Sequence, residues 1–218
     1  IAGSQCGDPE DAALCTIATC EIIVHKGPFP QALALSKAVL ERGGISPLSM
    51  LRLHLLESNI LHAAGSMEEA RARCESIVLN YTQSQSYSKE EQKVIAKGCI
   101  ELGKLEARQS NFKEGMEWCE KGLALFRSIK DKIGEAVAVS SVGAMYDYQH
   151  RDGEAERYYQ DSIQRLEELG NKSYIGAVYK NLAGIYQRQT EHEKSHFYFQ
   201  KGIDSCKEIH DKSGEAIG

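Results

Sequence analysis

The segment Asp131-Lys132-Ile133-Gly134-Glu135-Ala136 returns, with a single change, as Asp211-Lys212-Ser213-Gly214-Glu215-Ala216. Asn171-Lys172-Ser173 lies midway between the two copies, so the chain has a period of 40 residues. A fixed period of this length is typical of proteins that stack one small structural unit many times. Other markers recur in the same register: Leu102-Gly103, Val142-Gly143 and Leu182-Ala183; Tyr146 and Tyr186; Gly115, Ala155 and Ser195; Cys119, Tyr159 and Phe199; Gly122, Ser162 and Gly202.

The pattern inside one period predicts two helices. All four prolines lie at or before Pro47, so the strongest helix breaker is missing from the rest of the chain. Asp131, Asn171 and Asp211 stand where helix N-caps are expected. The small residues allow two helix axes to approach closely. In the second half of the period that begins at Asp131, apolar residues recur at three- and four-residue steps, as an amphipathic helix requires. They are Ala155, Tyr158, Tyr159, Ile163, Leu166 and Leu169.

These features resemble the tetratricopeptide repeat (TPR) family. The family pattern W-x2-L-G-x2-Y…A-x3-F is matched by Tyr179-x2-Leu182-Ala183-x2-Tyr186…Ser195-x3-Phe199. The chain departs from it by lacking the family's Trp and closing Pro and by carrying Glu106 at the Tyr position. Its repeat is longer than the usual length of about 34 residues. This resembles the longer repeats of kinesin light chains, LGN-type polarity adaptors and bacterial signalling ATPases.

The resemblance implies an all-α, right-handed α-solenoid of about five repeats in one array over residues 1–218. We expect the extra length of each repeat to extend its second helix. The repeats are predicted at 9–45, 47–86, 88–130, 131–170 and 171–210, with 211–218 as the start of a sixth. Because a solenoid needs a polar cap, we also expect the protein to continue beyond Gly218.

Composition narrows the function classes. The chain has 26 basic and 31 acidic residues, and this net charge of −5 argues against nucleic acid as a partner. No apolar stretch reaches the roughly 20 residues of a membrane-spanning helix. The number of cysteines is odd, at seven, and none forms a C-x-x-C pair. This favours buried thiols and a cytoplasmic location over a disulfide framework or a zinc ribbon.

One enzymatic motif is present. His192-Glu193-Lys194-Ser195-His196 matches H-E-x-x-H, which in zinc hydrolases places two imidazoles and a general base on one helix face. In the repeat register, however, Ser195 is the small residue that faces its partner helix, and no third ligand follows at the family spacing. We therefore expect no catalytic residue, no metal site and no cofactor, and adventitious metal binding by the two exposed histidines stays open. The aromatic residues are expected to be core: Tyr146, Tyr158, Tyr159, Tyr186, Tyr198 and Phe199.

The resemblance implies that first helices line a concave groove suited to an extended or helical segment. Carried over by register, its residues are Lys97, Glu101, Lys104 and Arg108, then Ser140, Ser141, Asp147 and Tyr148, then Lys180, Asn181, Gln187 and Arg188. Five of these are basic and two acidic, so we expect an acidic or amphipathic partner segment. Asn181 resembles the groove Asn of LGN-type repeats.

The carboxylate clamp of chaperone-binding TPRs is absent, because its places hold other residues: Leu55, Asn59, Glu101, Val137 and Ser141. Two functions stay open. The first is a non-catalytic protein-interaction scaffold. The second is the ligand-sensing arm of a larger signalling ATPase or transcription regulator, in which binding shifts an equilibrium between assemblies. The sequence identifies neither the partner nor the oligomeric state.

Overall fold

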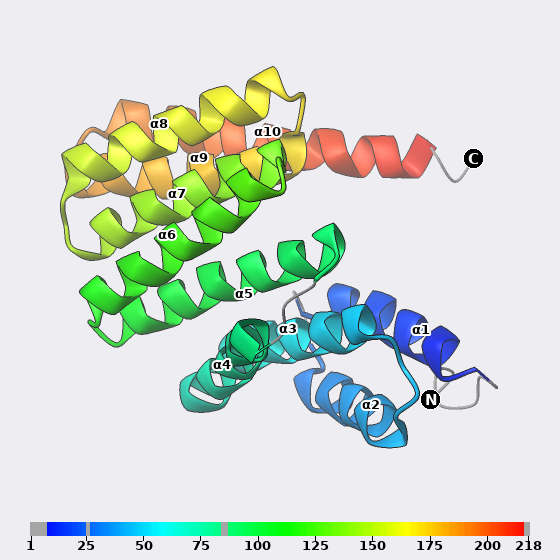
Figure 1. Cartoon of the computed structure of the whole chain (residues 1–218). Coiled ribbons are helices and arrows are strands. Elements are labelled where there is room, and N and C mark those ends of the chain that lie inside the picture. Colours follow the sequence, from blue (N-terminus) through cyan, green and yellow to red (C-terminus); the bar gives the residue numbers. More distant parts are fainter. Residues whose placement is uncertain (1–7, 25–26, 84–86, 216–218) are drawn as a thin grey trace. The chain divides into compact units, whose positions relative to one another are not determined.

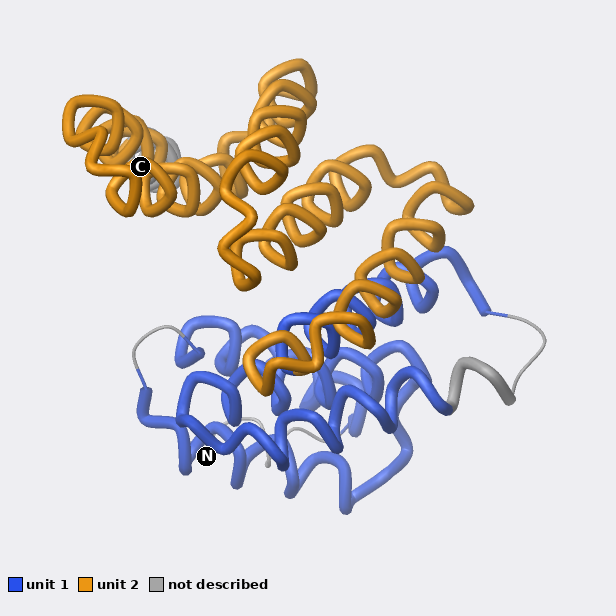
Figure 2. The backbone as a smooth tube through the Cα atoms, turned by 90° about the vertical axis from the view of Figure 1, so that its left-hand side faces the viewer, with its two compact units in different colours: residues 1–105 blue, residues 106–218 orange. Residues whose placement is uncertain are grey.

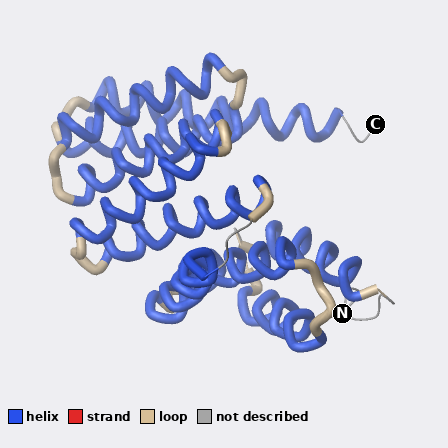
Figure 3. Tube along the Cα trace, in the orientation of Figure 1, coloured by secondary structure: helices blue, strands red, loops and turns tan. Residues whose placement is uncertain are grey.

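A computed structural model describes the backbone over residues 8–24, 27–83 and 87–215, and leaves aside the side chains of 80–83, 206 and 208–215. Within these ranges the chain forms ten helices and no strand, as Figure 3 shows. The all-α, TPR-like fold class expected from the sequence is thereby confirmed. Two compact units can be separated, residues 1–105 and 106–218 (Figure 2). Each is described by itself.

The helices follow one another with short connections (Figure 1). Each of the repeats 9–45 to 171–210 contains the start of two of them. In chain order they are α1 (Pro9–Ile23), α2 (Phe29–Arg42), α3 (Pro47–Ala64), α4 (Met67–Gln83), α5 (Lys89–Arg108), α6 (Phe112–Ser128), α7 (Lys132–Tyr148), α8 (Asp152–Glu168), α9 (Lys172–Arg188) and α10 (His192–Glu215).

One turn geometry recurs every 20 residues from α5 to α10. In each turn one residue has positive φ, and these residues are Ser110, Lys130, His150, Gly170 and Thr190. The next amide then donates to the carbonyl five residues back, as from Asp131 to Phe126 at 3.0 Å and from Arg151 to Tyr146 at 3.0 Å. This pattern satisfies carbonyls that a helix end otherwise leaves without a partner.

The recurring turn makes helix length uniform. Helices α6, α7, α8 and α9 are each 17 residues long. The expectation that the extra length of the repeat extends the second helix is therefore wrong, because α7 and α8 share it equally. The reason is that both connections, within a repeat and between repeats, use the same three-residue turn.

The next position in this series, residue 210, lies inside α10, which continues to Glu215. The sequence suggested instead that a sixth repeat begins at Asp211. Positive φ costs a non-glycine residue roughly 1–2 kcal/mol. In the described turns the extra hydrogen bonds and the packing of the following helix offset that cost.

The core of the second unit lies between successive helices. Tyr159 and Leu166 of α8 are fully buried and share one apolar cluster with Tyr179 and Leu182 of α9. Close crossings use small residues: the Ser162 hydroxyl donates to the Ala136 carbonyl at 2.8 Å. One period later, a Cβ on Gly202 would lie 3.2 Å from the Gly176 carbonyl oxygen.

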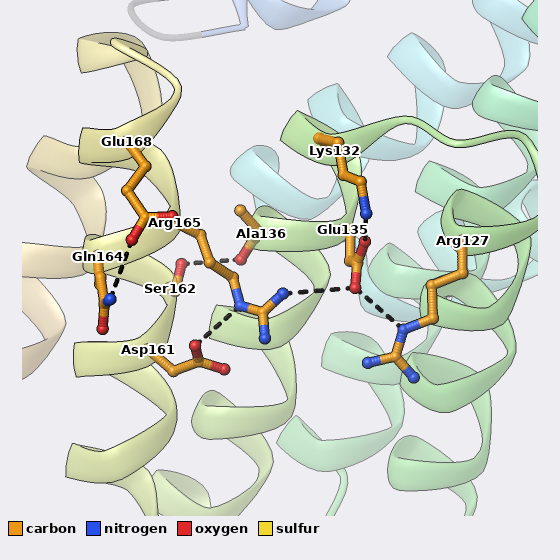
Figure 4. A network of polar contacts seen from close by, with 9 residues as sticks. All are labelled: Arg127, Lys132, Glu135, Ala136, Asp161, Ser162, Gln164, Arg165 and Glu168. Atoms are coloured by element: carbon orange, nitrogen blue, oxygen red, sulfur yellow. Dashed lines mark hydrogen bonds and ion pairs between the residues drawn. The ribbon is translucent and has the colours of Figure 1, made fainter.

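An ionic network joins α6, α7 and α8 (Figure 4). The buried carboxylate of Glu135 accepts hydrogen bonds from Arg127 Nε at 3.1 Å, Lys132 Nζ at 3.3 Å and Arg165 Nη1 at 3.4 Å. Asp161 accepts a further hydrogen bond from Arg165 Nε at 2.8 Å. Burial raises the pKa of Glu135, but the hydrogen bonds and charges of Arg127 and Lys132 outweigh it and lower the pKa overall.

The first unit has its own core. Ala12, Ile17, Ala32 and Leu53 belong to one buried cluster formed by α1, α2 and α3. The Glu10 carboxylate of α1 accepts from the Ser46 amide at 2.7 Å, the Ser46 hydroxyl at 2.8 Å and the Ser49 hydroxyl at 2.6 Å. It therefore caps the start of α3 across the repeat boundary.

A second polar link joins α3 to α5. His62 Nδ1 donates to Glu101 Oε1 at 2.5 Å, and Lys104 Nζ lies 3.5 Å from Glu101 Oε2. Burial disfavours the Glu101 carboxylate, yet the hydrogen bond from His62 and the charge of Lys104 lower its pKa to about 2. Glu101 is thus a structural anion in this unit.

We expect Gly134→Ala to lower the free energy of unfolding by about 1–3 kcal/mol, the usual cost of overpacking. A Cβ at Gly134 would lie 2.2 Å from Phe126 Cδ1. Urea denaturation measures the change. Gly153→Ala is the control, because a Cβ there meets nothing within 4 Å. Equal stability of the two variants would contradict this packing account.

We expect Glu101→Gln to cost about 2 kcal/mol of unfolding free energy at pH 7, the scale of a charged hydrogen bond. Because the folded pKa is lowered, the carboxylate contributes fully above its ordinary pKa of 4.5, and this contribution is lost as pH falls through about 2. Urea titrations at pH 7 and pH 3 should therefore show a smaller difference from wild type at pH 3. If the difference in unfolding free energy between wild type and Glu101→Gln is the same at both pH values, the prediction is wrong.

Candidate functional site

The inner face of the second unit, as we use the term, is the surface of α7 and α9 formed by Val137, Ser140, Ala144, Asp147 and Tyr148 on α7 and by Ala177, Lys180, Asn181, Gly184, Gln187 and Arg188 on α9. These positions recur at three- and four-residue steps, so on each helix they share one side. The two helices contact each other directly. The inner face is therefore one surface contributed by two first helices.

Small residues form the middle of the inner face. Ala177 is exposed, while Ala144 and Gly184 are partly buried. A Cβ on Gly184 would meet nothing within 4 Å. This distinguishes Gly184 from the helical glycines Gly134, Gly143 and Gly202, where a neighbouring side chain or carbonyl would lie within 3.2 Å of the added atom.

Gly184 therefore destabilises α9, and no packing contact within the described chain explains its presence. A glycine in a helix interior is roughly 1 kcal/mol less favourable than alanine. Within the described part of the chain, packing does not require it. A glycine that leaves open space on a groove lets a partner backbone approach the helix closely.

One end of the inner face is held together by Asp147. Its carboxylate accepts from the buried Tyr159 hydroxyl at 3.1 Å and also pairs with Arg188 of α9. Arg188 donates as well to Asp152 at 2.8 Å. Burial disfavours the charged guanidinium, but the bonds and charges of Asp152 and Asp147 raise the pKa of Arg188 overall. The link fixes the C-terminal end of α9 to α7 and α8.

The structure separates the groove residues expected from the sequence into three groups. Lys180, Gln187 and Tyr148 are exposed, and Ser140 and Asn181 are partly exposed. Ser141 is buried and donates to the Val137 carbonyl at 3.1 Å, so it does not line a groove. On α5, Lys97 and Arg108 are exposed, whereas Glu101 and Lys104 are joined in the link to His62.

Two of the five basic residues expected in the groove are engaged in ion pairs within the chain. Arg188 is neutralised by Asp147 and Asp152, and Lys104 by Glu101. On the inner face of the second unit Lys180 is the cation left without an ion pair among the described residues. The pairs of Lys104 with Glu101 and of Arg188 with Asp147 lie within the expected set and leave its excess of positive charge unchanged, and Asp152 is the one acidic residue added from outside it.

The H-E-x-x-H segment forms the first turn of α10. Ser195 is buried at 6% exposure, as its register position predicts, while His192, Glu193 and His196 are exposed. In the part of the chain that the structure describes, no group of three or more His, Cys, Asp or Glu residues is placed to hold a metal ion.

The aromatic residues behave as expected with one exception. Tyr159 and Tyr186 are buried, and Tyr146–Tyr158 and Tyr186–Tyr198 stack at 5.3 and 5.4 Å. Phe199, expected in the core, is 38% exposed. Its equivalent Tyr159 is covered by α9, and α10 has no following helix over this side in the described residues. None of the described helices is long and apolar enough to cross a membrane.

Comparison with known proteins places the fold. No protein-family model and no curated protein matches the chain. Solved structures do match. BtubC (BKLC) from P. vanneervenii has a TM-score of 0.64 at 13% identity, over 88% of this chain and 78% of that one. The kinesin light chain TPR-like repeats of Podosopora anserina have a TM-score of 0.60 at 14% identity, over 95% and 99%.

A third structure is the signal transduction ATPase (STAND) protein with a TPR sensor from Pyrococcus horikoshii, with a TM-score of 0.65 at 20% identity. The match covers 93% of this chain and 31% of that one. At these identities the likeness concerns the fold. The chain has the tetratricopeptide-repeat fold, as its 40-residue pattern indicated.

We expect Asp147→Ala to lower the free energy of unfolding by about 1–3 kcal/mol, because it leaves the buried Tyr159 hydroxyl without its acceptor. Asp152→Ala should cost less than about 1 kcal/mol, since it removes only a pair to a half-exposed arginine. Urea denaturation of both variants tests the order. In a Tyr159→Phe background the cost of Asp147→Ala should fall, and an unchanged cost would contradict the assigned contact.

Proposed function

We propose that this protein is a non-catalytic protein-interaction module whose inner face on α7 and α9 binds a segment of another protein. The observation that carries the proposal is Gly184, a helix-interior glycine whose missing side chain leaves open space on this face. The TPR fold supports it, because stacked helix pairs offer extended surfaces suited to peptides and helices.

The surroundings of Gly184 indicate the chemistry of the segment. Ala144 and Ala177 supply a low apolar floor, and Tyr148 adds an exposed aromatic ring. Asn181 offers both a donor and an acceptor one helical turn away. Lys180 adds one cation. We therefore propose an amphipathic segment that places small apolar groups on the floor and a single acidic side chain near Lys180.

We also propose a cytoplasmic location. The support is chemical: Cys20 and Cys74 are buried free thiols, and burial raises the pKa of Cys74 to about 12. Such thiols act as small apolar core residues and do not need an oxidising compartment.

Display selection of random peptides on the protein tests the proposed surface. We expect selected peptides to bind the wild-type protein and Gly153→Gln alike, and Gly184→Gln at least tenfold more weakly. A Cβ at either glycine meets nothing within 4 Å, but only Gly184 lies on the inner face. Circular dichroism controls for folding.

A charge reversal on the inner face provides a second test of the same surface. Lys180→Glu should weaken the selected peptides, and the effect should shrink at high salt because exposed charges are screened. Arg188→Glu is a poorer probe, since Arg188 holds α9 to α7 and α8. Peptides that bind Gly184→Gln as tightly as wild type would refute the proposed site.

A further inference from the structure

The outer face of α10, as we use the term, is formed by His196, Phe199, Ile203 and Lys207. These residues recur at three- and four-residue steps, so they share one side of the helix. All four are exposed, and the exposed fraction is 38% for Phe199 and 50% for Ile203. The outer face is therefore an open apolar pair with an imidazole at one end and an ammonium group at the other.

The same face of α8 is buried under the helix that follows it. One repeat earlier, the equivalent positions hold Glu156, Tyr159, Ile163 and Glu167. Tyr159 is fully buried and Ile163 is 8% exposed, and both belong to one apolar cluster with Leu182 of α9. This side of a second helix is therefore a helix-packing surface. In the part of the chain that the structure describes, no helix follows α10 to cover it.

The polar ends of this surface have opposite chemistry on α8 and α10. On α8 both ends are carboxylates that accept from tyrosine hydroxyls of α9. Glu167 accepts from Tyr179 at 2.9 Å, and Glu156 accepts from another tyrosine at 2.5 Å. On α10 the same positions hold Lys207 and His196. An ammonium group only donates, and a carboxylate is its strongest acceptor in proteins.

A third helix shows what meets a cation at this position. Arg127 of α6 is the equivalent of Lys207, two repeats earlier. Its Nε donates at 3.1 Å to Glu135, which lies in the first turn of α7, the helix that follows α6 (Figure 4). Where α8 carries Glu167 instead, the first turn of α9 has Ile175 in place of Glu135. A cation on the second helix is thus accompanied by a carboxylate in the first turn of the helix that covers it.

We propose that the outer face of α10 binds an amphipathic helix of a partner protein that carries a carboxylate in its first turn. The helix lies antiparallel to α10, as α7 lies on α6. Its first-turn carboxylate pairs with Lys207, its apolar side covers Phe199 and Ile203, and an acceptor near its other end meets His196. This surface shares no residue with the inner face, so the proposal stands whether or not the proposed function of that face holds.

The probe is an acetylated and amidated peptide of residues 131–148, because α7 carries Glu135 and packs in this way on a helix with a cation. Fluorescence anisotropy at low salt should show saturable binding to the chain at or below about 1 mM peptide. Phe199→Ser should weaken binding at least tenfold. Phe197→Ser is the matched control and should leave binding unchanged, because Phe197 is also exposed, at 53%, but lies on another side of α10.

Charge reversal tests the ion pair. Lys207→Glu should bind the peptide at least threefold more weakly, and a peptide with Glu135→Lys should bind this variant better than it binds the wild type. The difference should shrink at high salt. Lys180→Glu makes the same change in net charge on the inner face, so it should bind the peptide as the wild type does. This control separates the outer face of α10 from the surface of the proposed function.

Circular dichroism checks that each variant is folded. Undiminished binding by Phe199→Ser or by Lys207→Glu would overturn the proposal, and so would the absence of binding at about 1 mM peptide. Two further measurements test other occupants. Self-association of the chain in sedimentation, abolished by Phe199→Ser, would assign the face to a second copy. Peptide binding that appears only when residues 211–218 are removed would assign it to the chain itself. Either result would overturn the assignment to a partner.

Discussion

The recurring three-residue turn is the constraint on which the second unit depends. A residue of positive φ every 20 residues, followed by an amide that bonds back five residues, gives α6, α7, α8 and α9 the same length of 17 residues. Small residues then meet backbone where α8 crosses α7 and where α10 crosses α9, and tyrosines stack within these two helix pairs. The turn is tolerated at non-glycine residues because packing on both sides holds it.

The regular frame lets equivalent positions take different roles. Ser162 bonds to a carbonyl where Gly202 simply allows contact. Glu135 is the centre of an ionic network where Ile175 borders a pocket. Gly134 is required by the ring of Phe126, whereas Gly184 faces open space. Function in such a fold is therefore sought where a repeat departs from its neighbour, since the shared positions already serve the packing.

Much of the fold could be predicted from the sequence, because the periodic signals are local. The echo of Asp131–Ala136 and the tyrosine positions indicated helix pairs, and Ser195 was correctly expected to be buried. Turn geometry was less accessible, since Lys130, His150 and Thr190 carry no glycine signal for positive φ. That is also why equal helix lengths and the course of α10 past residue 210 were not foreseen.

The candidate site was harder to predict because it depends on pairing between helices. The register located Lys180 and Asn181 on the exposed side of α9, but it could not show that Arg188 is held by Asp147 and Asp152 or that Ser141 is buried. It did not single out Gly184. Its significance emerges only when the space beside its Cα is known.

The central claim is that a partner segment lies on the inner face of α7 and α9. A backbone amide NMR map of the second unit with a tightly bound selected peptide tests this most directly. We predict that the largest shifts occur at Ala144, Ala177, Asn181 and Gly184, with small changes along the outer side of α8. Shifts concentrated on α8 and α10, with Gly184 unaffected, would contradict the account.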